Sequence, residues 1–379
     1  MQKIIFPKST IVALAFTALC IIACDQQNKE GHNDGGVEND AADMDSGLHD
    51  ASIDDASDGS NDSGGCKWRI DNEYQNYLYS LNRIWGLGPN DIYAVGGEGT
   101  PAGDVGIIYH YDGKEWRRME IAEMPVLKGI WGTSDSDLFA IGLQGAIYHY
   151  DGNQWTRSFQ TESQTDLVNI WGSNGSDVYV ISSTKRSDGT VVVERGGEII
   201  HFDGTNWDIE IDGKGVWELM NVWGSSQTDV YVVGIGKTGG GKYNKHFNGT
   251  DWEDVDISQT CYDVWGTGAN DVYLICTSVA IEHFDGNSWS ENDVDIPGVI
   301  ERITGNSKDE IYLLSYMFDD SANIMGSSVY HNGQTGWSKT DSNESWIMNA
   351  LWADNNNQAF ALGYVKDTPT GLILRYSCQ

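Results

Sequence analysis

The sequence predicts an all-β fold, a seven-bladed β-propeller of four-stranded blades whose ring is closed by an N-terminal strand. Three observations support this prediction. The 379 residues include 45 Gly, 6 Pro, 15 Trp and 18 Tyr, a composition typical of tight turns between aromatic-rich strands. From Trp85 onward one phrase recurs at intervals of 46, 40, 52, 42, 39 and 48 residues, close to the length of a propeller blade. Residues 66–68 match only the end of that phrase, so they supply a strand that the last copy lacks.

The chain begins with the features of a secretory signal. Lys3 and Lys8 precede an apolar stretch over residues 11–23, which is too short for a membrane-spanning helix. Residues 21–24, Ile-Ile-Ala-Cys, resemble the lipobox of bacterial lipoproteins. The resemblance implies a signal peptide over residues 1–23, diacylation of Cys24, and a lipid-anchored place in the cell envelope, at the periplasmic face, the outer membrane or the cell surface. An ordinary signal peptide with an incidental cysteine is the alternative.

Residues 25–65 predict a disordered acidic tether. They contain twelve Asp or Glu residues, one basic residue (Lys29) and no aromatic residue, so they cannot bury a core. A calcium loop over residues 40–45 is disfavoured because its acidic spacing lacks the glycine and distal glutamate of an EF-hand. The predicted domains are therefore a signal peptide (1–23), a lipidated cysteine with its tether (24–65) and a propeller (66–379).

Each copy of the repeat predicts four strands. An apolar strand ends at Trp-Gly, a second opens with Asp, a third reads Ile-x-His-aromatic, and a fourth carries Trp after an Asp-Gly or Asn-Gly turn. These turn dipeptides suit two-residue hairpins, whose central residues need positive φ. The copies start at Trp85, Trp131, Trp171, Trp223, Trp265, Thr304 and Trp352. The seventh copy ends before its closing tryptophan, which we expect Trp68 to supply.

The repeat resembles a known class of propeller sequences. The Tyr/Phe-Asp-Gly-x-x-Trp turn with its preceding strands resembles kelch and Asp-box repeats, and the longer Trp-Gly phrase is similar to repeats of bacterial secreted propellers described as kelch-like or BNR-like. The resemblance covers nearly all of residues 66–379. It implies the fold rather than the function, because propellers host enzymes, lectins and scaffolds. The full Asp-box motif and the paired glycines of kelch are absent from the sequence.

The four cysteines of the predicted propeller allow two disulfides outside the cytoplasm. Ring closure places Cys66 and Cys378 on adjacent strands, so we predict a bond between them. Cys261 and Cys276 flank the Trp-Gly hairpin of the fifth copy, and we predict that they pair across it. No Cys-x-x-Cys spacing indicates a metal site, and neither a metal nor another cofactor is predicted.

Six histidines and five aspartates recur at fixed positions of the repeat. The symmetry of a ring would hold the histidines apart, so they cannot converge on one ion, and we predict that they are structural and hydrogen-bond within each blade. We predict that the recurring aspartates cap the turns in which they stand. The histidines are His110, His149, His201, His246, His283 and His331, and the aspartates are Asp91, Asp137, Asp177, Asp229 and Asp271.

Function is expected in what does not repeat, because the repeated residues build the scaffold. The variable segments, residues 97–105, 182–196, 235–245 and 315–327, fall between second and third strands. Tyr79, Trp217 and Trp346 each lie six residues before a Trp-Gly position. We predict either that these aromatic residues bind a sugar or a peptide, or that they pack beneath the loops.

A set of mostly polar residues, assigned to the position two residues before each Trp-Gly, predicts a ring around the central channel. These residues are Arg83, Gly129, Asn169, Asn221, Asp263, Arg302 and Asn349. The ring predicts a polar mouth that hydrogen-bonds a ligand, and a water-filled channel is the alternative.

Charge narrows the class of partner. The net charge of −33 excludes a protein that wraps nucleic acid. Residues 1–24 contribute +2 and the tether −11, which leaves −24 on residues 66–379. We predict a membrane-anchored monomer that acts as a binding or scaffold module for a protein or glycan ligand. The alternative is a carbohydrate-active enzyme, a glycosidase or lyase, with its site at the channel mouth, although the sequence assigns no catalytic residue.

Overall fold

All described residues belong to one compact unit, residues 60–379. The computed structural model describes residues 65–75, 79–101, 103–119, 121, 124–184, 191, 197–237, 241–276, 280–319, 323–333, 336–340, 345–354, 358–368 and 370–377. The predicted signal peptide, Cys24, the tether up to residue 64, and Cys378 lie outside the described residues.

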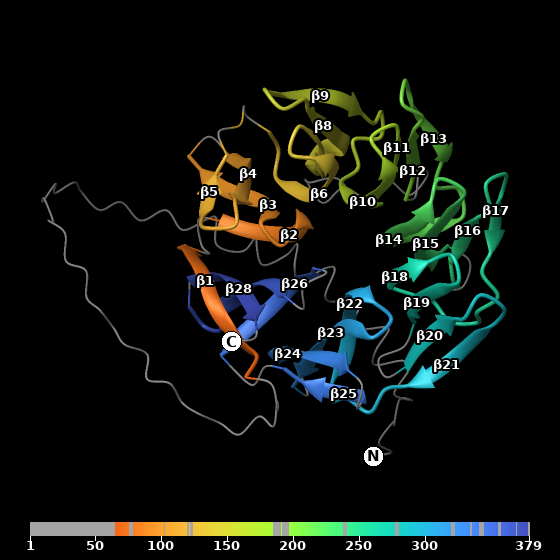
Figure 1. Ribbon diagram of the computed structural model, residues 1–379. Coiled ribbons are helices and arrows are strands. Elements are labelled where there is room, and N and C mark those ends of the chain that lie inside the picture. The colour runs from red at the N-terminus through yellow and green to blue at the C-terminus, as the bar shows by residue number, and fades with distance from the viewer. Residues whose placement is uncertain are drawn as a thin grey trace, which may run out of the picture. The chain divides into compact units, whose positions relative to one another are not determined.

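Seven four-stranded antiparallel sheets surround a common axis, which confirms the predicted propeller (Figure 1). The first four blades contain β2 (Tyr79–Gly88), β3 (Asp91–Thr100), β4 (Gly103–Tyr111), β5 (Trp116–Arg118); β6 (Leu127–Ser134), β7 (Asp137–Gly142), β8 (Ala146–Tyr150), β9 (Trp155–Gln160); β10 (Leu167–Asn174), β11 (Asp177–Ser182), β12 (Ile199–Phe202), β13 (Trp207–Ile211); and β14 (Val216–Ser226), β15 (Asp229–Gly236), β16 (Lys245–Phe247), β17 (Trp252–Asp254). The last three contain β18 (Asp263–Gly268), β19 (Asp271–Ile275), β20 (Ala280–Phe284), β21 (Trp289–Asp293); β22 (Val299–Ser307), β23 (Glu310–Phe318), β24 (Ile324–Gly333), β25 (Gly336–Lys339); and β26 (Trp346–Ala353), β27 (Ala359–Val365), β28 (Thr370–Ser377), β1 (Lys67–Gln75).

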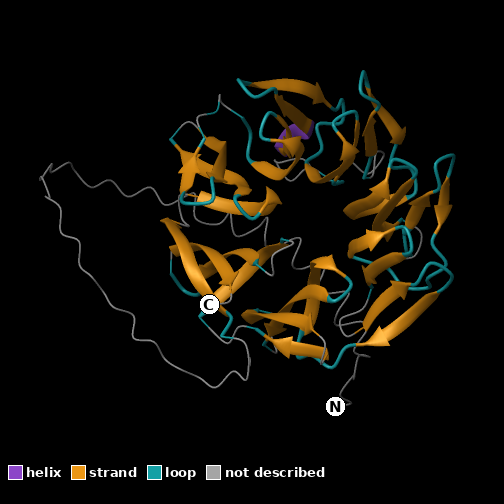
Figure 2. Cartoon of the chain, viewed as in Figure 1, coloured by secondary structure: helices purple, strands orange, loops and turns teal. Residues whose placement is uncertain are grey.

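Helical structure is almost absent from the described residues. Their one helix is the short 3-10 turn η1 (Leu143–Gly145), the small helical segment in Figure 2. Within the ranges given above, no helix has the length and apolar character needed to cross a membrane.

The N-terminal strand completes the seventh blade. The strand order of this sheet is β1-β28-β27-β26, and Figure 1 shows β1 beside β28. Lys67 pairs with Ser377 and Trp68 with Tyr376, which confirms the predicted closure. Next to the Lys67–Ser377 pair, the chain continues to Cys66 on one side and to position 378 on the other. Because Cys378 lies outside the described residues, the disulfide between these cysteines stays a prediction.

The hydrophobic core lies between neighbouring blades. One buried cluster joins Ile84 and Ile92 of the first blade to Phe360 and Leu362 of the seventh. The inner strands β2, β6, β10, β14, β18, β22 and β26 each contact the next in the ring, and β26 contacts β2. Burying one such aliphatic side chain contributes about 1.5–3 kcal/mol, so the contacts between the first and seventh blades, which require closure, stabilise the ring.

The Trp-Gly dipeptides connect successive blades. A Cβ at Gly172 would lie 2.6 Å from Cη2 of Trp131 in the preceding blade, and one at Gly224 would lie 2.6 Å from Cη2 of Trp171. The same clash would arise at Gly86, Gly266 and Gly305, against Trp352, Trp223 and Trp265 respectively. At these five positions glycine leaves room for the indole of the blade before it, whereas a Cβ at Gly132 would first meet Asp137 and Leu138 of its own hairpin.

The degenerate sixth blade agrees with this explanation. It keeps Gly305, which faces Trp265 of the fifth blade, but carries Thr304 in place of tryptophan. The seventh blade then carries Ala353 where the other blades have glycine. The glycine is lost at the one position whose preceding blade lacks the tryptophan.

Candidate functional site

The repeated histidines are hydrogen-bonded inside their own blades, as predicted. Nε2 of each lies 2.7–2.8 Å from an Oδ1 oxygen in the pairs His110–Asp91, His149–Asp137, His201–Asp177, His246–Asp229 and His283–Asp271. In the sixth blade His331 pairs with Glu310 at 2.6 Å. The second oxygen of Asp177 accepts a hydrogen bond from the hydroxyl of Ser173, near the end of β10. The aspartates therefore both cap the turn and hold the histidine.

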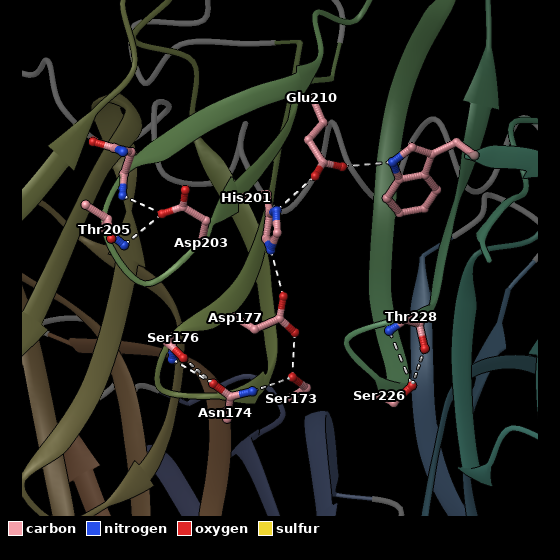
Figure 3. A network of polar contacts seen from close by, with 12 residues as sticks. Ser173, Asn174, Ser176, Asp177, His201, Asp203, Thr205, Glu210, Ser226 and Thr228 are labelled. Atoms are coloured by element: carbon pink, nitrogen blue, oxygen red, sulfur yellow. Dashed lines mark hydrogen bonds and ion pairs between the residues drawn. The ribbon is translucent and has the colours of Figure 1, made fainter. Parts of the chain in front are cut away.

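His201 has two carboxylate partners. Figure 3 shows it between Asp177 and Glu210, whose Oε1 lies 2.9 Å from Nδ1 of His201. The other oxygen of Glu210 accepts the indole N–H of Trp252, in the next blade, at 2.9 Å. Burial alone would lower the pKa of His201, but the bonds to both carboxylates outweigh it and raise this pKa to about 9. The cluster therefore holds a charged histidine between the third and fourth blades.

Glu210 belongs to a pattern that the sequence interpretation missed. The third residue after the outer-strand tryptophan accepts the indole N–H of the next blade's outer tryptophan in four cases. These pairs are Ser158 with Trp207, Glu210 with Trp252, Thr340 with Trp68, and Asp71 with Trp116. Met119 stands at this position in the first blade, and the buried Nε1 of Trp155 has no hydrogen-bond partner among the described residues. The fixed spacing was the available signal.

The seventh blade replaces the histidine–aspartate pair with an arginine cluster at the ring closure. Nη2 of Arg375 lies 2.6 Å from Oδ1 of Asp71 on β1 and donates to the hydroxyl of Tyr111 at 2.5 Å. Its guanidinium stacks 5.2 Å from the ring centre of Phe360. Burial opposes the charged form, but the bonds to Asp71 and Tyr111 raise the pKa of Arg375. This cluster joins the N-terminal strand, the C-terminal strand and the first blade.

Polar side chains of three neighbouring inner strands are linked across the blades, and a backbone group of a fourth strand joins them. Asn169 donates to Asn221, and Asn221 donates to Oδ1 of Asp263. Oδ2 of Asp263 accepts the backbone N–H of Ile303 at 2.8 Å. The structure thus brings together three of the predicted ring residues and occupies both oxygens of Asp263.

The sequence assigned Asn349 to the ring around the channel, and this assignment is wrong, because Asn349 lies one residue before the ring position of its strand. In the first blade, Leu81 and Arg83 pair with consecutive residues of β3, so Asn82 between them is bulged. The seventh blade has the same irregularity at Asn349, and Ala350 occupies the ring position. Nδ2 of Asn349 reaches the carbonyl oxygen of Leu81 at 3.4 Å, just as Asn82 reaches that of Leu127 in the next blade at 2.8 Å.

Three of the four charged groups beside the axis are held by protein atoms. Asp263 is 1% exposed, and its burial raises its pKa against the attraction of Arg302. Nη1 of Arg302 lies 3.4 Å from Oε1 of Glu301, whose pKa burial raises to about 7 against the same attraction. The buried Nε atoms of Arg83 and Arg302 both lack an acceptor within the described part of the chain, but of the two arginines Arg302 has a carboxylate partner through Nη1 and Arg83 does not. Burial and the neighbouring Arg302 lower the pKa of Arg83 to about 10, so it is still charged at neutral pH.

The three predicted aromatic residues do not gather at one place. Trp217 is 45% exposed and bulges from β14 between Val216 and Glu218. Trp346, on the seventh blade, is part-buried and pairs with Val365. Tyr79 begins β2, and its side chain lies outside what the structure describes.

The second predicted cysteine pair lies at disulfide distance. The Sγ atoms of Cys261 and Cys276 are 2.01 Å apart, and both residues are buried. Nδ2 of Asn244 lies 3.2 Å from the sulfur of Cys261. Over the described ranges, no group of three or more His, Cys, Asp or Glu side chains is arranged to hold a metal ion.

Comparisons show the fold alone. The chain matches no known family and no curated protein. It is similar to the solved structure described as "YCF48 bound to D1 peptide", with 13% identity and a TM-score of 0.57, covering 82% of this chain and 97% of that one. It is also similar to a catalytically inactive virginiamycin B lyase from Staphylococcus aureus with quinupristin, with 8% identity and a TM-score of 0.60, covering 83% and 100%. A third is the WD40 propeller domain of Doa1, with 9% identity and a TM-score of 0.55, covering 82% and 97%.

Proposed function

We propose that the protein is a lipid-anchored propeller of the cell envelope that binds a protein ligand through its loop face. The loop face is the side where first strands begin and second strands end, as Val216 of β14 pairs with Gly236 of β15. The observation that carries the proposal is Trp217, a large aromatic side chain that a bulge holds 45% exposed on this face. Exposed tryptophans that become buried on binding are common energetic centres of protein interfaces.

The remainder of the scaffold favours a binding role. The repeated histidines and acids hydrogen-bond each other within their blades, as His246 does with Asp229 at 2.7 Å. Two of the variable segments are largely extended strand ends, because residues 97–100 pair with 103–106 and residues 315–318 pair with 324–328, and these ends adjoin the loop face. A propeller of similar fold described as bound to a peptide supports this mode of binding by analogy. A glycan ligand remains the other outcome of the test below.

Site-resolved photo-crosslinking tests the proposal. A photoreactive phenylalanine analogue replaces Trp217 in one variant and Ile209 in the matched control. Ile209 is 38% exposed, but it lies on the outer strand β13 of the neighbouring blade. We expect a discrete protein adduct in intact cells from position 217 and none from position 209. Equal adducts from both positions, or adducts from position 209 alone, would contradict a binding site on the loop face.

The lipid anchor has its own test. We expect the protein in the membrane fraction, with the mass of the N-terminal peptide increased by a diacylglyceryl group on Cys24. Cys24→Ser should release the protein into the soluble fraction without changing the propeller. Recovery of an unmodified Cys24 would argue for an ordinary signal peptide.

A second candidate function is a carbohydrate-active enzyme with its site at the axis. The observation that favours it is Glu301, whose pKa of about 7 suits a general acid or base. Nearby Asp263 would have to act as the second carboxylate, but both of its oxygens already accept hydrogen bonds. Turnover of a glycan library that Glu301→Gln abolishes would establish the enzyme, and no turnover would exclude it for those glycans.

A further inference from the structure

Resting on the proposed function, we propose that Arg83 receives a carboxylate of the bound ligand at the propeller axis. Arg83 lies at the ring position of β2 and is only part-exposed. Its buried Nε has no acceptor within the described part of the chain. A buried donor on a charged group costs free energy when it is unpaired, and an arriving acceptor recovers that cost.

The neighbouring acids are already engaged. Asp263, on the strand β18 of the fifth blade, is electrostatically coupled to Arg83, but its two oxygens accept from Asn221 and from the backbone N–H of Ile303. Oε1 of Glu301 lies 3.4 Å from Nη1 of Arg302. The Nε of Arg302 also lacks an acceptor among the described residues, but Arg302 is already paired with Glu301, so Arg83 is the arginine of this cluster that we assign to a ligand.

The chemistry of Arg83 favours a monoanion. A guanidinium presents parallel N–H donors that fit a planar carboxylate or a phosphate. A dianionic phosphate would be repelled by the nearby Asp263 and by the −24 charge of residues 66–379, the remainder after the signal and tether are subtracted from −33. A carboxylate brings one negative charge, which one unpaired arginine neutralises. Such a carboxylate comes from a peptide terminus or acidic side chain, or from a small carboxylic acid.

Nuclear magnetic resonance on the whole ¹⁵N-labelled protein tests this assignment. The probes are acetylated tetra-alanine with a free C-terminal carboxylate, the same peptide as its C-terminal amide, and succinate. We expect the free-acid peptide to shift the Nε–Hε resonance of Arg83 and the amide to leave it unchanged. Arg83→Gln should weaken binding of the free-acid peptide at least tenfold. Arg157→Gln is the matched control, since Arg157 is exposed on the outer strand β9, and it should bind normally.

Each outcome decides one point. Equal binding of amide and acid, or full binding by a folded Arg83→Gln variant, would overturn the proposal. If Arg83→Gln fails to fold, Arg83→Lys keeps the charge without the paired donors and should lose part of the affinity. Succinate binding as tightly as the peptide would support the carboxylate site and assign it to a small acid. Adducts at Trp217 without any carboxylate binding would refute the carboxylate site alone and leave the loop-face proposal standing.

Discussion

Replacing Gly172 with alanine should destabilise the ring, because the new methyl group enters the indole of Trp131. Its Cβ would lie 2.6 Å from Cη2 and 2.7 Å from Cζ3 of Trp131, and 2.9 Å from the carbonyl oxygen of Asp177. Carbon atoms prefer about 3.5–4.0 Å, and Trp131 is only 9% exposed, so its indole is confined. Overpacking costs about 1–3 kcal/mol. The reduced freedom of the unfolded chain returns about 0.4–1 kcal/mol, which leaves a net loss of about 1–2 kcal/mol.

A double-mutant cycle isolates the contact between the blades. Trp131→Thr alone should cost about 3–5 kcal/mol through the space it leaves. Combining it with Gly172→Ala imitates the natural Thr304 and Ala353 pair of the sixth and seventh blades. The double variant should be more stable than the sum of the two losses by about 1–2 kcal/mol.

Urea unfolding followed by far-ultraviolet circular dichroism measures all three variants. Ala353→Gly is the matched control, because the preceding blade presents no tryptophan to it, and it should cost less than about 1 kcal/mol. A neutral Gly172→Ala, or additive losses in the double variant, would refute the reasoning. The glycine would then serve its own hairpin rather than the indole of the blade before it.

Three further predictions concern the charge clusters and the ring closure. His201 has a pKa of about 9 in the folded protein, against an ordinary 6.5. Its contribution to stability, at most about 3 kcal/mol, should therefore be complete below pH 6.5 and vanish as the pH rises through 9. Urea unfolding across this pH range should show the decline in the free energy of unfolding, and Glu210→Gln should flatten that decline. An unchanged slope in that variant would rule out the carboxylate as the cause. Arg375→Met should lower the free energy of unfolding by about 3 kcal/mol, because the half-buried Asp71 keeps its hydrogen bond from Trp116 but loses its charged partner. A loss below about 0.5 kcal/mol, typical of a surface substitution, would contradict the closure role. Mass mapping without reduction should find Cys66 linked to the C-terminal peptide, and Cys66→Ser should cost about 4 kcal/mol in thermal unfolding; a free thiol at Cys66 would disprove the bond.

The blade number, the ring closure and the roles of the repeated histidines were predictable, because each rests on residues that recur at a fixed spacing. Asn349 was misplaced by one residue, because it stands three residues before Trp352 whereas the other ring residues stand two before their Trp or Thr, so the spacing alone pointed to Ala350. The second carboxylate partner of His201 is Glu210, which reaches it by an ion pair from a bulge of β13, and the fixed spacing of the repeat does not mark that bulge. Arg375 occupies a histidine position of the repeat, so the sequence marked the exception without showing that Asp71 is its partner.

The loop face was predictable as a location but not in its details. Strand order alone places the variable segments on one side of the ring. That Trp217 is exposed while Trp346 is part-buried depends on a bulge in one strand and on pairing with Val365 in the other. Two residues at the same position of the repeat therefore differ in their availability to a ligand.

Hydrogen–deuterium exchange of the protein with its crosslinked ligand recovered from cells tests the central claim most directly. Binding through the loop face should slow exchange at the start of β14, around Trp217, and at the end of β15, around Gly236. The hairpin turns on the opposite side, such as that of Gly113, should exchange as in the free protein. Protection confined to those hairpin turns or to the outer strands would contradict the account.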